Sequence, residues 1–80
     1  MAAPPGWVER DDALEREFTF PSFGEAVAFV NRVAELAEAE DHHPHLTVDY
    51  RRVTVRWSTH TAGGVTDRDR ALAPRTDELA

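Results

Sequence analysis

The sequence predicts an α+β fold in which a four-stranded antiparallel sheet carries two helices on one face. Three observations lead to this fold class. Apolar and polar residues alternate with a period of two in three segments, the stretch between the first and second of these has a helical period, and a second helix start follows the last. The expected order is strand, strand, helix, strand, strand, helix.

The first two strands are expected at residues 7–10 and 14–20, with a tight turn at Asp11 and Asp12 between them. The second strand is half-buried, because its apolar residues fall on one face and its acidic residues on the other. The apolar face consists of Leu14, Phe18 and Phe20. Pro21 then breaks the pattern.

A helix is expected to begin at Ser22, because Ser22 and Glu25 have the spacing of a capping box. Pro44 disfavours helical geometry at His43, so this helix should end near Asp41 or His42. Its apolar residues form one broad stripe: Phe23, Ala26, Val27, Val30, Val33, Ala34 and Ala37.

The second half of the chain repeats the strand pair and adds a second helix. Strands are expected at residues 45–50 and 52–60, joined by a hairpin turn around Tyr50 and Arg51. After a flexible loop at 61–64, a helix is expected to start at Thr66, with Asp69 in its first turn. Pro74 would cost about 3 kcal/mol inside that helix, so no conformation is predicted for residues 74–80. We expect one domain over residues 1–80, with residues 1–5 flexible.

Composition limits the function classes. The 80 residues carry a net charge of −6, which argues against a nucleic-acid partner or an anionic membrane surface. The absence of cysteine, of a secretory signal pattern and of an apolar run near the ~20 residues of a membrane span favours a cytoplasmic protein. A chain this short builds only a small core, so burial at a subunit interface is expected.

Three of the four histidines are expected to meet at the ends of elements. His42 and His43 lie where the helical pattern ends, and His60 lies where a strand pattern ends. Histidine exchanges protons near neutral pH, so converging imidazoles indicate a proton-transfer site or a metal site. Glu38 precedes His42 by four residues on the same helical face, where it could orient that ring or raise its pKa.

Each of these residues also has an ordinary structural explanation. A histidine near a helix end is a favourable charge there, Glu38 with His42 could be an exposed pair, and Asp69 could be only a cap. The combination is harder to dismiss than its members. A zinc site would take three imidazoles from four candidates: His42, His43, His45 and His60.

Acid–base chemistry without a metal is the better interpretation of this cluster. Adjacent histidines rarely chelate one ion together, and the sequence has neither a His-x-x-x-His pair nor a cysteine. His45 alternates with Leu46 and so should lie on the sheet face away from the apolar residues.

The spacing of these residues resembles that of the pterin-4a-carbinolamine dehydratase family. Residues 6–7, 18–23, 58–60 and 64–69 are also similar, so the resemblance covers nearly the whole chain, although Pro74 and Thr76 depart from the family's long apolar second helix. The motif consists of Glu38, His42, His43, Pro44, Tyr50, His60 and Asp69.

The resemblance implies a dehydratase that converts a 4a-hydroxytetrahydropterin to the quinonoid dihydropterin without a metal or organic cofactor. It implies that His42 and His60 are the acid–base groups and that His43 mainly binds and positions the pterin. Glu38, Pro44 and Asp69 would be supporting residues. Family members form oligomers, which implies a homodimer or homotetramer here.

The same resemblance leaves a second function open. Proteins of this fold also act as a dimerisation cofactor for a transcription factor or as a carboxylase assembly factor. The complete histidine triad favours the enzyme, because a scaffold has no physical reason to keep three imidazoles in this arrangement.

Overall fold

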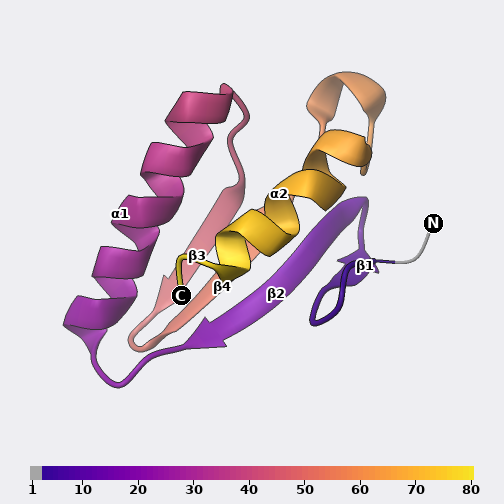
Figure 1. Cartoon of the computed structure of the whole chain (residues 1–80). Coiled ribbons are helices and arrows are strands. Elements are labelled where there is room, and N and C mark those ends of the chain that lie inside the picture. The colour runs from indigo at the N-terminus through magenta and orange to yellow at the C-terminus, as the bar shows by residue number, and fades with distance from the viewer. Residues whose placement is uncertain (1–2) are drawn as a thin grey trace.

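A mixed α+β architecture is found, as the sequence predicts, in the computed structural model, which describes residues 3–80. The four strands form one antiparallel sheet, and both α-helices lie on the same face of it (Figure 1). The elements in chain order are β1 (Val8–Arg10), β2 (Ala13–Thr19), α1 (Phe23–Glu40), β3 (His45–Asp49), β4 (Arg52–Trp57), a 3-10 turn (His60–Ala62) and α2 (Asp67–Asp77).

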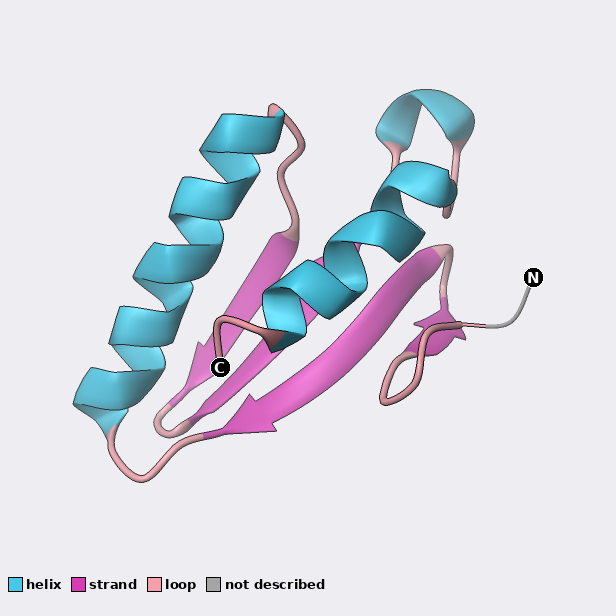
Figure 2. Cartoon of the chain, in the orientation of Figure 1, coloured by secondary structure: helices cyan, strands magenta, loops and turns pink. Residues whose placement is uncertain are grey.

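The strand order across the sheet is β1-β2-β4-β3, which places the two predicted hairpins side by side (Figure 2). The long contact between them joins β2 to β4, from Leu14 opposite Trp57 to Thr19 opposite Arg52. Both hairpins have two-residue turns. Asp11 and Asp12 have φ angles of 50° and 63°, the left-handed geometry that matches the twist of a β-hairpin.

The core lies between the sheet and the two helices. Alternate residues of β4 point into it, so Val53, Val55 and Trp57 are fully buried, as predicted. The buried face of α1 differs in part from the predicted stripe: Ala26, Phe29, Val33 and Ala37 are buried.

Two members of the predicted stripe are on the surface. Phe23 is 52% exposed and Ala34 is exposed, whereas Phe29, which the prediction omitted, is fully buried. Phe29 completes the 26, 29, 33, 37 series, which follows the helical period more closely than a stripe through Phe23. The buried face of α1 is therefore rotated about the helix axis relative to the predicted stripe, toward Phe29.

The second helix continues through Pro74 to Asp77, past the point at which the sequence pattern stops. Proline cannot donate the amide hydrogen bond of that turn, but Pro74 is on the exposed side of the helix, which continues through it. The end of α2 is held to the rest of the molecule by Asp77, which accepts from the Trp7 indole at 3.0 Å and pairs with Arg16 at 2.9 Å.

The chain start and the loop at 61–64 also have more structure than the sequence suggests. Of the residues expected to be flexible, 1–2 lie outside the described part, Ala3 contacts the core, and the Pro4 carbonyl accepts from the Trp7 amide at 3.0 Å. His60–Ala62 form a 3-10 turn closed by a bridge between Thr59 and Gly64.

Within residues 3–80, neither helix has the length and apolar character that crossing a membrane requires.

Candidate active site

The end of α1 turns His42 into the protein. Asp41 adopts the left-handed conformation, with φ of 49°, and the amides of Asp41 and His42 donate to the carbonyls of Glu38 and Ala37. These two bonds are those of a Schellman motif, which reverses the chain at a helix end. His42 is thereby only 9% exposed, and its ring stacks on Trp57 with 5.8 Å between centroids and 5° between planes.

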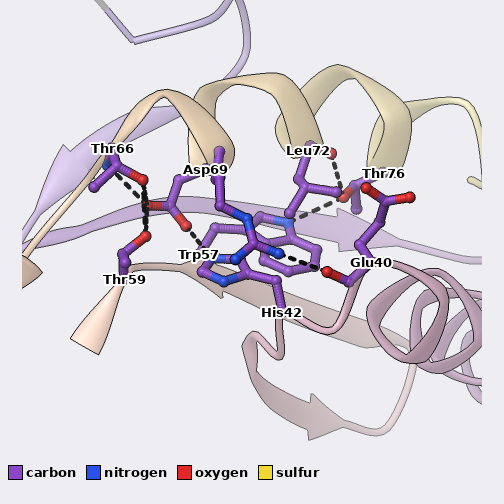
Figure 3. A network of polar contacts seen from close by, with 9 residues as sticks. Glu40, His42, Trp57, Thr59, Thr66, Asp69, Leu72 and Thr76 are labelled. Carbon is purple, nitrogen blue, oxygen red and sulfur yellow. Dashed lines mark hydrogen bonds and ion pairs between the residues drawn. The ribbon is translucent and has the colours of Figure 1, made fainter. Parts of the chain in front are cut away.

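Asp69 meets His42 from the start of α2. Its carboxylate caps that helix by accepting from the Thr66 amide at 2.8 Å, as the sequence spacing predicts. The same carboxylate accepts from the Thr59 hydroxyl at 2.8 Å and lies 2.7 Å from Nε2 of His42 (Figure 3). Asp69 is fully buried, so every bond that it makes is sheltered from water.

The charge of Asp69 determines the proton position on His42. Burial alone would raise the pKa of this carboxyl, but hydrogen bonds from His42, the Thr66 amide and the Thr59 hydroxyl outweigh burial and hold the pKa below its ordinary value. An ionised carboxylate only accepts hydrogen bonds, so Nε2 of His42 must be the donor. The remaining ring nitrogen, Nδ1, is then the one that can take up and release a proton.

Nδ1 of His42 is open to solvent. Among the described residues it has no hydrogen-bond partner, and in the same part of the chain no buried side-chain nitrogen or oxygen lacks one. The atom is therefore not fully buried, and His42 lines a cleft of about 310 Å³ between the ends of α1, β4 and α2. The cleft is lined by Asp41, His42, His43, Ser58, Thr59, His60, Thr61 and Arg68.

The structure brings His42, His43 and His60 together in this cleft, as predicted. His60 does not end a strand, because β4 ends at Trp57 and His60 begins the 3-10 turn. His43 lies at the mouth, where Nε2 is 2.5 Å from Oε2 of Glu38 and both side chains are more than half exposed.

The predicted partnership of Glu38 with His42 is wrong. It assumed helical geometry as far as His42, in which residues four apart lie on the same face. Instead, α1 ends at Glu40 and Asp41 reverses the chain. The reversal carries His42 inward to Asp69 and leaves His43 beside Glu38. Two separate carboxylate–histidine pairs result, one buried and one exposed.

Two residues of the sequence cluster lie elsewhere. Tyr50 is in the turn between β3 and β4 and is 67% exposed. That turn is at the opposite end of the sheet from the C-terminal end of α1 (Figure 1). His45 does not line the cleft; it lines a second cavity of about 360 Å³ with Asp11, Asp12 and Arg56, and this cavity shares Ser58, Thr59 and His60 with the cleft. No group of three or more histidine, aspartate or glutamate side chains within residues 3–80 is arranged to hold a metal ion.

Sequence reasoning missed residues that contact the buried pair, Trp57 and Thr59, and one that lines the cleft, Arg68. Trp57 was predicted only as a core residue, and neither Thr59 nor Arg68 was singled out. The capping spacing of Thr66 and Asp69 was a usable signal for one bond of the carboxylate. Nothing in the local sequence indicates its other partners, because they come from distant segments.

Comparisons with known proteins agree on one family. The family model described as Pterin 4 alpha carbinolamine dehydratase matches residues 1–79. A protein of Thermomicrobium roseum, described as a "Putative pterin-4-alpha-carbinolamine dehydratase", is 57% identical over 76 residues, which cover 95% of this chain and 82% of that protein.

Two solved structures have the same fold. A transcriptional coactivator/pterin dehydratase from Brucella melitensis superposes with a TM-score of 0.89 at 37% identity, covering 95% of this chain and 83% of the other. A pterin dehydratase-like protein, described as a RuBisCO assembly factor in the alpha-carboxysome, has a TM-score of 0.76 at 25% identity, covering 100% of this chain and 90% of the other.

Proposed function

The chain belongs to the pterin-4a-carbinolamine dehydratase family, whose members are hydro-lyases, and from that premise we propose that it dehydrates a 4a-hydroxytetrahydropterin. The product is the quinonoid dihydropterin, and water leaves. The observation that carries the proposal is the buried Asp69–His42 pair, whose free ring nitrogen opens into a cleft that His43 and His60 also line.

The reaction needs two proton movements. A general acid protonates the 4a-hydroxyl, the C4a–O bond breaks, and a general base removes the proton from N5 as the new double bond forms. No electrons are gained or lost, so the step needs no oxidant or reductant. His42 and His60 flank the cleft and are the two acid–base groups, which together can supply roughly 10²–10⁴-fold of acceleration.

The other residues bind and orient. His43 lies at the cleft mouth and positions the pterin, with Glu38 holding its ring. Asp69 orients His42, and Pro44 fixes the chain direction directly after the two histidines. The cleft volume of about 310 Å³ lies at the lower end of the range for small-molecule sites, which suits a bicyclic ligand with an open side.

The test is the decay of enzymatically generated 4a-hydroxytetrahydropterin, followed by its ultraviolet absorbance with and without the protein. We expect a rate well above the spontaneous one and near-complete loss of the acceleration in His42→Ala. A folded wild-type protein that leaves the spontaneous rate unchanged would disprove the proposal.

One observation favours a second candidate, a non-catalytic assembly or dimerisation role. The relative described as a RuBisCO assembly factor shares the fold over the whole of this chain. The absorbance assay separates the two functions, because an assembly factor has no need to accelerate dehydration. A folded, inactive protein would favour this second role.

We further propose that the chain forms a homodimer or homotetramer. Strand β3 is at an open edge of the sheet, and Val48 on it is 43% exposed. Phe23 and Tyr50 are 52% and 67% exposed, so apolar surface is left uncovered on the single chain. Light scattering coupled to size exclusion should give two or four times the mass of the 80-residue chain. A monomer at micromolar concentration would contradict this.

A further inference from the structure

Helix α2 holds two buried polar side chains against the sheet, Asp69 and Thr76. They are seven residues apart, which is two helical turns, so both face the same way (Figure 3). Both are fully buried. Asp69 bonds to His42, and Thr76 bonds to Trp57. The rings of His42 and Trp57 are stacked, so side chains of one helix are hydrogen-bonded to both rings of a single aromatic stack.

The hydroxyl of Thr76 has a fixed direction. It donates to the Leu72 carbonyl at 2.8 Å, one helical turn back, and this uses its only hydrogen. Its lone pairs are then free to accept from Nε1 of Trp57 at 3.0 Å. The indole N–H can only donate, and Trp57 is fully buried, so this bond fixes the in-plane orientation of the indole.

The indole in turn defines the plane of the His42 ring. The bond from Nε2 to Asp69 holds one atom of the imidazole in place but only partly restrains the rotation of the ring about its Cβ–Cγ bond. The stacked indole removes this freedom, because the two ring planes differ by only 5°. The direction of Nδ1 toward the cleft thus depends on Trp57 as well as on Asp69.

We propose that Thr76 is a positioning residue for His42 and acts through Trp57. The predicted effect of Thr76 on turnover rests on the proposed dehydratase function, whereas its predicted effect on the orientation of the His42 ring does not. The net contribution of a buried hydroxyl–indole bond to stability is small, and an apolar pair of the same shape could be nearly as stable. What the bond adds is a defined geometry, which an apolar contact lacks.

The test compares Thr76→Val, which has the same shape without the hydroxyl, with Thr76→Ser, which keeps the hydroxyl. The nitrogen and proton resonances of the His42 ring and of the Trp57 indole are measured by NMR, together with kcat and KM. Thr54→Val is the matched control, because Thr54 is on the same strand as Trp57 and on the opposite sheet face.

We expect Thr76→Val to shift and broaden the His42 ring signals. It should also lower kcat about tenfold at nearly constant KM, which is less than the roughly 10²-fold loss of rate that a 1 Å misplacement can cause. Thr76→Ser and Thr54→Val should match the wild type. Trp57→Phe removes the indole donor without leaving it unpaired, so it should reproduce the His42 shift even if Thr76→Val folds poorly.

Unchanged His42 signals in a folded Thr76→Val variant would overturn the inference. So would a loss in Thr76→Val that Thr76→Ser shares, because the hydroxyl would then not be its cause. If the wild type has no dehydratase activity, the proposed function fails, and the NMR comparison alone still decides whether Thr76 positions His42.

Discussion

Oδ1 of Asp69 lies 2.7 Å from Nε2 of His42, and the bond joins the end of the first helix to the start of the second. The aspartate is fully buried and the histidine is 9% exposed. Water therefore competes little for either partner, and the bond fixes both the tautomer and the direction of the imidazole. This pair determines which histidine nitrogen faces the cleft.

Replacing Asp69 by asparagine should reverse the tautomer of His42. The Thr66 amide and the Thr59 hydroxyl both donate to Oδ2, so the amide oxygen of asparagine would take that place and its NH₂ would face Nε2. Nε2 would then have to accept, which moves the ring proton to Nδ1 and blocks the base. We expect kcat in the dehydration assay to fall on the order of 10²-fold.

The matched control for that change is Asp67→Asn. Asp67 is in the same turn of α2, but its side chain is 88% exposed and pairs with Arg70. This variant should keep wild-type kcat. Equal activity of the two variants would show that the Asp69 charge does not act through His42.

The free energy of unfolding should fall at acid pH because of Asp69. Its folded-state pKa lies below the unfolded value of about 3.9, so the ionised carboxylate stabilises the fold fully above that value. The contribution is lost as the pH falls from about 4 through the folded-state pKa. Urea unfolding between pH 6 and pH 3 should show a decline that is shallower in Asp69→Asn than in the wild type. Parallel curves for the two proteins would contradict this.

The sequence was sufficient to predict most of the fold, because the signals for it are local. Alternation at Val53, Val55 and Trp57 identified a buried strand face, and Ser22 accepts from the Glu25 amide as its spacing indicated. The error at Phe29 came from placing the stripe through Phe23 and Ala34, which left Phe29 outside it, although Phe29 shares the buried face with Ala26 and Val33.

The site was harder to predict, because its key contacts join distant segments. The cluster of three histidines was found, but the partner of His42 was not. Left-handed geometry at a helix end is usually signalled by glycine, and here an aspartate, Asp41, adopts it. Without that signal, helical geometry was expected as far as His42, and Glu38, four residues earlier, was taken as its neighbour. Thr76 looked like an interruption of an apolar helix until its bond to Trp57 was visible.

His42→Ala and His60→Ala should each lose most of the dehydratase activity while remaining folded. Each removes one of the two acid–base groups, so each should lose a large part of the 10²–10⁴-fold that such groups contribute. Turnover corrected for the spontaneous reaction is the measurement, and circular dichroism checks the fold. His45→Ala is the control, because His45 lies outside the cleft. Full turnover in both cleft variants would refute the catalytic assignment.

Glu38→Gln should raise KM several-fold and leave kcat and thermal stability nearly unchanged. Glu38 and His43 form an exposed pair, and exposed pairs contribute well under about 1 kcal/mol to stability. Their proposed role is to present the His43 ring to the pterin, and glutamine holds that ring less firmly because it lacks the charge. Glu35→Gln, at an exposed position one turn earlier on α1, is the control. A fall in kcat at constant KM would instead place His43 among the proton-transfer groups, because binding would then be unaffected while the chemical step slowed.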